Sequence, residues 1–311
     1  MKKLIILSAF FSLPAFASTP ILNTDFLDKG EQMVTGGFNH YKIEMEGDIA
    51  PDDINFDGSG AQTELSLKYA YGFTKKQLLI LDIPYTFLGK RESDFTFTDG
   101  TKVKFKSEGE GLGDLSAEYR FLLKDAGSQR IAVMLGADIP VGDDDSGESE
   151  IIENGVKTQS MKKGGVGSGR SDFRAATSMS SGTGNTTFFA SALYELIGTK
   201  TDEGEEIEPG DEIFLEAGLL QKIDAKSNLG ALVGYNYTLE GKRADVDISS
   251  TSSYAASVAY FYHVTNSFML SPQVAYIATP EQKETDRTDG SVMTFSKFNA
   301  FSFTVEFSKT F

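Results

Sequence analysis

The sequence contains no cysteine and no tryptophan, and only two histidines and eight prolines among its 311 residues. Without cysteine there is neither a disulfide framework nor a thiolate metal site. No apolar run reaches the roughly 20 residues that a membrane-spanning helix needs. The chain is rich in glycine (31), phenylalanine (24) and tyrosine (12), a balance that favours strands joined by turns.

The formal net charge is -16. Nucleic-acid binding requires clustered lysine and arginine, so this excess of acid argues against a nucleic-acid partner. It predicts a solvated surface that repels anions.

The first residues read as a secretory signal peptide. Lys2 and Lys3 precede an apolar stretch over residues 4–16, and Ala15 and Ala17 are the small residues that a signal peptidase recognises. We therefore predict a signal peptide at 1–17, cut before Ser18, and a mature domain at 18–311.

Apolar and polar residues alternate along most of the chain from residue 61 onward. On one segment Leu65, Leu67 and Tyr69 share one face, while Ser66 and Lys68 share the other. This is the period of a strand and not of a helix. Segments of this kind predict about twelve strands; they lie at residues 34–45, 64–73, 79–87, 114–121, 131–139, 173–179, 188–196, 213–219, 229–237, 254–262, 268–276 and 303–311.

Short and long connections alternate between these segments. The short ones lie at residues 74–76, 124–128, 181–184, 224–227 and 264–266. The long ones lie at residues 46–60, 89–111, 140–169, 198–212, 240–252 and 279–297, and together they account for the whole net charge of -16. This asymmetry is typical of outer-membrane barrels. The prediction is an all-β, closed antiparallel transmembrane β-barrel with short periplasmic turns and long acidic extracellular loops.

The chain ends on one largely aromatic face, whose alternate positions are Phe303, Val305, Phe307, Lys309 and Phe311. Many outer-membrane barrels carry such an assembly signal on their last strand. Lys309 interrupts it, but a lysine close to the membrane edge can extend its amine into the interface. We expect outer-membrane lipid, lipopolysaccharide and the barrel-assembly machinery as partners, the last through the strand that ends at Phe311.

Charged residues on the polar face of the strands are expected to line the pore, and acids outnumber bases among them. An eight-stranded barrel is filled by side chains, and barrels of about sixteen strands hold wide channels. A twelve-stranded one therefore favours a narrow passage, and an anion-selective pore is disfavoured. The predicted pore-lining residues are Glu64, Lys68, Asp82, Asp114, Glu118, Arg120, Arg130, Asp138, Asp172, Arg174, Glu195, Glu216, Lys222 and Glu306.

Two motifs suggest ligands but fail on spacing or context. Residues 164–171, GGVGSGRS, come close to a phosphate-binding loop, but Arg170 replaces the lysine and a strand follows instead of a helix. Asp143, Asp144 and Asp145 with Glu148 do not follow the twelve-residue calcium loop. We interpret the first as a glycine loop and the second as a solvated loop, with divalent-ion binding at the lipopolysaccharide surface as an alternative.

The hypothesis that the protein is an enzyme would depend on His40 and His263. They are predicted in different strands, and no G-x-S-x-G elbow is present. We therefore expect no enzymatic activity, no catalytic or metal-binding residues and no cofactor.

Four short stretches carry a family resemblance: LDIPY at 81–85, GLGDLSAEYRFLL at 111–123, GADIPVGD at 136–143 and GSGRSDF at 167–173. With them the chain resembles the meta-pathway phenol degradation family of outer-membrane proteins. The resemblance implies a barrel transporter for a small aromatic or apolar solute and supplies no catalytic residue.

Two functions from different classes follow. The first is an outer-membrane channel for passive passage of small solutes, aromatic or apolar compounds among them. The alternative is a plugged structural barrel whose acidic loops bind divalent ions, lipopolysaccharide or surface partners.

Overall fold

The computed structural model describes residues 26–51, 54–142, 148–162, 167–202, 205–243, 246–286 and 290–311. The predicted signal peptide, and Asp143, Asp144 and Asp145 of the acidic cluster, lie outside the described residues. The described chain forms one sheet of 20 strands. Among these residues, no helix has the length and apolar character that crossing a bilayer requires.

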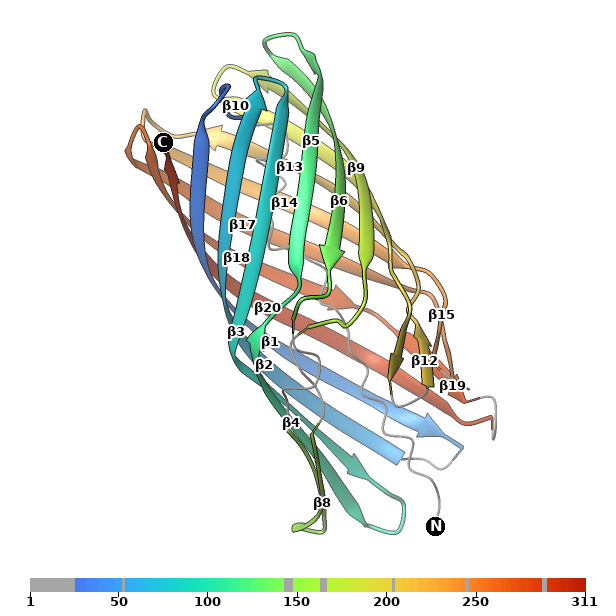
Figure 1. The fold of residues 1–311 in the computed structure, drawn as a ribbon. Coiled ribbons are helices and arrows are strands. Elements are labelled where there is room, and N and C mark those ends of the chain that lie inside the picture. The colour runs from blue at the N-terminus through green and yellow to red at the C-terminus, as the bar shows by residue number, and fades with distance from the viewer. Residues whose placement is uncertain are drawn as a thin grey trace.

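The wall is a closed ring of antiparallel pairs. It runs through β1 (Gln32–Ala50), β2 (Ile54–Thr74), β3 (Gln77–Thr96), β5 (Leu115–Asp125), β6 (Gln129–Ile139), β9 (Asp172–Thr183), β10 (Thr186–Leu196), β13 (Glu212–Lys222), β14 (Ser227–Thr238), β17 (Thr251–Thr265), β18 (Phe268–Thr279) and β20 (Val292–Thr310). β20 pairs back onto β1 from Met33 and Thr310 to Ala50 and Val292, and this seam closes the barrel. Figure 1 shows the strands running obliquely around it.

Five short turns lie at one end of the ring, together with Gln32 and Phe311. We call this the short-turn end; it is the upper end in Figure 1. The turns follow β2, β5, β9, β13 and β17, close to the predicted positions. The predicted separation of short and long connections is therefore confirmed.

At the opposite, long-loop end the sheet continues in shorter strands. These are β4 (Lys102–Leu112), β7 (Glu148–Glu153), β8 (Val156–Lys162), β11 (Lys200–Asp202), β12 (Glu205–Glu208), β15 (Gly241–Arg243), β16 (Val246–Ile248) and β19 (Gln282–Asp286). The expectation of about twelve strands leaves out these outer strands: the described chain has 20 strands in all, because each of the six segments expected as long loops contains strand residues. β3 shows the continuation, since its outer half pairs with β4 and its other half with β5.

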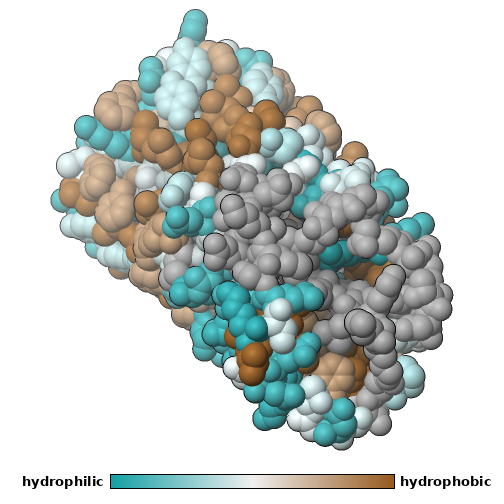
Figure 2. All heavy atoms as spheres, turned by 60° about the horizontal axis from the view of Figure 1, so that its bottom comes forward, coloured by the Kyte–Doolittle hydropathy of each residue, from teal (hydrophilic) through white to brown (hydrophobic). Residues whose placement is uncertain are grey.

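Large apolar side chains cover the outside of the wall near the short-turn end. Leu67, Leu135 and Val233 are 55%, 66% and 60% exposed. Their neighbours along the strands point inward, as the alternation predicts. Figure 2 shows the apolar residues on this part of the wall and hydrophilic residues on the long-loop end.

The polarity of the two faces inverts at the long-loop end. There Phe56, Phe95 and Phe295 are packed on the inside; Phe56 contacts the other two rings at centroid distances of 5.6 and 5.1 Å. On the outside Lys104 pairs with Glu92 at 3.3 Å. This arrangement is that of a soluble sheet, so we place these outer strands beyond the membrane band.

Candidate channel lumen

The inward side chains enclose a cavity of about 600 Å³. It extends from Ser267 and Thr310 at the short-turn end to Asp114 and Ser168 at the middle of the barrel. Eleven of the fourteen predicted pore-lining residues line this cavity: Glu64, Lys68, Asp82, Asp114, Glu118, Arg120, Asp138, Asp172, Arg174, Glu195 and Glu306. Strand alternation was sufficient to place them on the inner face.

Three predicted residues do not line the cavity. Arg130 lies near the short-turn end, where its Nε is 3.6 Å from an Asp125 oxygen. Glu216 faces inward and accepts a hydrogen bond of 2.8 Å from Ser191 Oγ. Lys222 is exposed at the end of β13. Alternation gives the face of a side chain but not its height along the barrel.

Lys68 connects strands on either side of the seam. Its Nζ is 3.0 Å from Glu306 Oε1 on β20 and 3.8 Å from Asp82 Oδ2 on β3. The bridge to β20 passes over Gly37 of β1, where an added Cβ would lie 2.4 Å from Ser66 Oγ. A glycine here lets the inward side chains of β2 and β20 meet across β1.

Arg174 is the centre of a second ionic group. Its guanidinium donates to Asp138 Oδ1 at 2.7 Å and lies 4.0 Å from both Glu118 and Glu195. Close by, Arg170 Nε donates to Asp172 Oδ1 at 3.1 Å. Four neighbouring strands, β5, β6, β9 and β10, are thus tied together inside the lumen.

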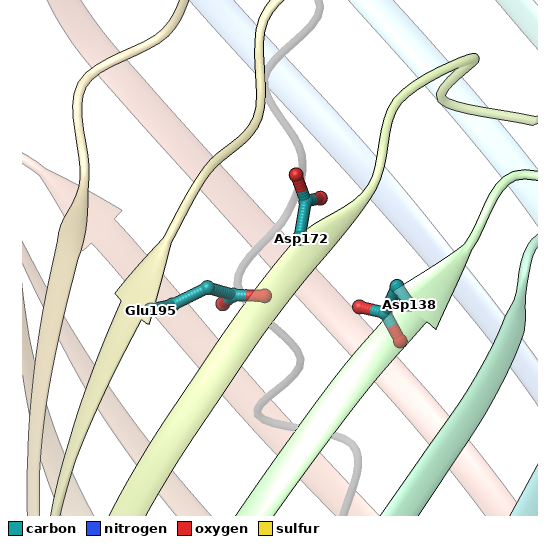
Figure 3. Close-up of side chains that lie close together, drawn as sticks. All are labelled: Asp138, Asp172 and Glu195. Atoms are coloured by element: carbon teal, nitrogen blue, oxygen red, sulfur yellow. The ribbon is translucent and has the colours of Figure 1, made fainter.

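Asp138, Asp172 and Glu195 have carboxylate oxygens within 4.8 Å of one another. Figure 3 shows them side by side on β6, β9 and β10. Arg174 and Arg170 already supply the positive charge for Asp138 and Asp172. We therefore interpret Asp138 and Asp172 as counter-ions of two arginines and not as metal ligands.

Sequence reasoning missed Arg170, Glu212 and Asn236. Arg170 and Glu212 line the cavity, and Asn236 donates to Glu212 Oε2 at 3.2 Å. The sequence pattern places Arg170 and Glu212 in loops at the ends of strands. Extending the alternation of residues 172–174 and 214–216 by one step would have placed both on the inner face.

The four family-like stretches meet at the outer end of the cavity. Gly113 N donates to Pro84 O at 2.9 Å, so the first two stretches touch. Asp114 accepts hydrogen bonds from Gly142 N at 3.2 Å and Ser168 N at 2.7 Å, which joins the other two. Asp114 therefore joins Gly142 and Ser168, the two ends of the segment between β6 and β9, and these stretches have a structural role.

The two histidines do not form a shared site. His40 Nδ1 is 2.9 Å from Thr63 Oγ1, and His40 pairs in register with Phe303, an outward aromatic. His263 lines the cavity near its short-turn end. The two imidazoles therefore belong to opposite faces and different heights of the wall.

Beyond the cavity, toward the long-loop end, the inside of the barrel becomes apolar. Ile43, Ile277 and Phe298 form a buried cluster on β1, β18 and β20, with Phe214 of β13 packed against it. These side chains are buried, so hydrocarbon lines this part of the inside of the barrel, next to the ionic cavity.

A closed antiparallel barrel with an apolar outer band and a polar interior defines an outer-membrane β-barrel, because such a wall leaves no backbone group unpaired in lipid. The chain belongs to the family described as "Putative MetA-pathway of phenol degradation", whose model matches residues 71–295. The search of curated proteins returned no match.

Two solved structures share the fold. One is an outer-membrane channel from Pseudomonas putida F1, 11% identical, with a TM-score of 0.59 over 93% of this chain and 98% of that one. The other is the transport unit of the autotransporter AIDA-I from Escherichia coli, 12% identical, with a TM-score of 0.50 over 95% of this chain and 97% of that one. At these identities they establish the fold alone.

Proposed function

We propose that the chain is a passive outer-membrane channel for small solutes, aromatic or apolar compounds among them. The observation that carries this proposal is the cavity of about 600 Å³ inside a closed barrel, lined by ionic residues and by apolar ones such as Leu78, Ile80 and Met269. A cavity of that volume accommodates a small organic molecule. Membership of a phenol-degradation family and a fold shared with a Pseudomonas channel support a transport role.

The eleven cavity residues predicted from sequence are proposed to line the path. Acids exceed bases among them, so neutral and cationic solutes are favoured over anions. The apolar cluster around Ile43 and Phe298 is proposed as the narrowest, hydrocarbon-lined part of the route. It would let apolar solutes pass more readily than hydrated ions.

The test uses purified protein in liposomes and in planar bilayers. We expect liposome swelling with phenol or small neutral solutes and small unitary conductance. Phe298→Ala should increase both, and Phe301→Ala, an outward residue on the same strand that is 51% exposed, is the matched control. Absence of both uptake and conductance would contradict the channel proposal.

The alternative is a plugged barrel that acts through its outer surface. The ion pairs of Lys68 and Arg174 along the inner wall favour it, because paired side chains fill space. Deleting residues 143–169 separates the two functions. Lost binding of lipopolysaccharide or divalent ions with unchanged permeability would favour the plugged barrel, and changed permeability would favour the channel.

The absence of enzymatic activity also belongs to the proposal. The positions of His40 and His263 on different faces support it, since acyl hydrolysis needs a base beside a nucleophile. Loss of a measurable hydrolase activity on replacing both histidines by alanine would contradict it.

We further propose that residues 1–17 are a signal peptide and that the barrel-assembly machinery recognises the last strand. β20 ends at Thr310, and Lys309 Nζ lies 4.8 Å from the centre of the Phe311 ring. Deleting Phe311 should slow folding into membranes. Contact with lipopolysaccharide is proposed at the polar outer strands.

A further inference from the structure

Glu195 and Glu212 face each other directly across β10 and β13. They are partners in register, and both line the cavity. Two like charges at directly opposed positions of an antiparallel pair destabilise it. Solvent does little to relieve them, since Glu212 is only 6% exposed.

The nearby arginines are engaged elsewhere. Arg174 makes its short contact, 2.7 Å, with Asp138 and stays 4.0 Å from Glu195. Arg170 is bound to Asp172 at 3.1 Å. Glu195 and Glu212 thus lie near two arginines without a short ion pair to either one, although buried carboxylates are normally paired at close range.

Asn236 provides a second, independent observation beside Glu212. It is 2% exposed, and its amide group already touches Glu212, to which Nδ2 donates at 3.2 Å. Its Oδ1 is buried without a hydrogen-bond partner. Buried amide oxygens nearly always have a donor or a cation, so this acceptor beside Glu212 is an exception that needs an explanation.

We propose that Glu195, Glu212 and Asn236 form a divalent-cation site in the lumen wall, with Ca²⁺ as the ion that fits it best. Two carboxylates and an amide oxygen are hard ligands of the kind that Ca²⁺ takes, and the flexible coordination of Ca²⁺ leaves room for water from the cavity. The charge of the ion matches the two carboxylates that the arginines leave poorly compensated.

The site shares Glu195 with the three-carboxylate group but leaves out Asp138 and Asp172. An ion there would lie against two guanidinium groups. At Glu212 the hydrogen-bond donor is the neutral amide of Asn236, and Arg170 acts on this carboxylate only from a longer distance. A bound ion would hold β10 and β13 together. It would also give hydrated cations a fixed binding position on the inner wall formed by these two strands.

The test is calorimetric titration of CaCl2 into the detergent-folded full chain, after treatment with a chelator. We expect saturable binding of one ion, with MgCl2 binding more weakly because Mg²⁺ sheds water reluctantly. The variant E195Q/E212Q should lower the affinity for Ca²⁺ by about tenfold or more. It should fold normally, because removing two opposed charges relieves repulsion.

The matched control is E216Q. Glu216 lies on the same strand, faces inward and is bound to Ser191, but it does not line the cavity. It should leave Ca²⁺ affinity unchanged. Calcium should also raise the thermal unfolding temperature of the natural chain and not that of E195Q/E212Q.

No binding of Ca²⁺ at millimolar concentration, equal affinity in E195Q/E212Q, or equal loss in E216Q would each overturn the proposal. Liposome swelling with a neutral solute is measured in parallel. A protein that transports without binding Ca²⁺ refutes only the cation site, and one that binds Ca²⁺ without transporting refutes only the channel.

Discussion

Replacing Arg174 by methionine should destabilise the barrel strongly. The guanidinium makes a 2.7 Å contact with Asp138 and lies 4.0 Å from Glu118 and Glu195. Its side chain is 11% exposed, so water cannot take its place easily. Removing one partner from a buried ionic group typically costs about 3 to 5 kcal/mol, because it leaves the other charges unpaired. We expect a loss of that size.

Arg130 provides the control. It also sits inside a strand of the ring, but its contact with Asp125 is 3.6 Å long and its side chain is 37% exposed. Screening by solvent limits such a pair to about 0 to 1 kcal/mol. Replacing Arg130 by methionine should therefore cost far less than the same change at Arg174.

The assay is urea unfolding in phospholipid vesicles, followed by far-ultraviolet circular dichroism and tyrosine fluorescence, since the chain has no tryptophan. The double variant R174M/D138N should regain part of the lost stability, because it removes one of the negative charges that R174M leaves unpaired. If R174M and R130M lost equal stability, or if D138N made R174M worse, the assignment of Arg174 as the organising charge would be refuted.

Three further predictions concern other parts of the wall. Replacing Gly37 by leucine should cost about 1 to 3 kcal/mol in the same unfolding assay, since its side chain would meet Ser66 Oγ at the seam. Asp114→Ala should speed protease cleavage of the excursion after β6, because two backbone donors lose their acceptor at about 1 to 3 kcal/mol each. Burial raises the pKa of Glu284 on β19 to about 7, against the opposing effect of Arg243. The unfolded chain releases this proton at lower pH, so stability should fall by about 3 kcal/mol as pH rises from about 4.5 to 7, and Glu284→Gln should abolish that slope.

Alternation along the strands predicted the closed barrel and most of the cavity residues. It works because one residue in two must face lipid, as Leu67 does at 55% exposure, while its neighbour Lys68 turns into the lumen. The ion-pair partners of these residues could not be predicted from the sequence. Nothing in the local pattern of β2 indicates that Lys68 meets Glu306, 238 residues away, because that contact depends on closure of the ring and on Gly37.

The outer strands were missed for a physical reason that also explains the missed residues. Beyond the membrane band the inner face carries aromatic residues such as Phe95 and the outer face is charged. Residues such as Glu92 and Lys104 therefore give the segment the composition of a loop, although alternation persists. Polarity and alternation carry different information. The two-residue alternation indicates a strand in any surroundings, whereas the polarity of the outward face indicates whether lipid or water surrounds that strand. If only the alternation is considered, β13 begins at Glu212, which lines the cavity. If charged residues are taken to indicate a loop, the predicted strand is too short and omits Glu212.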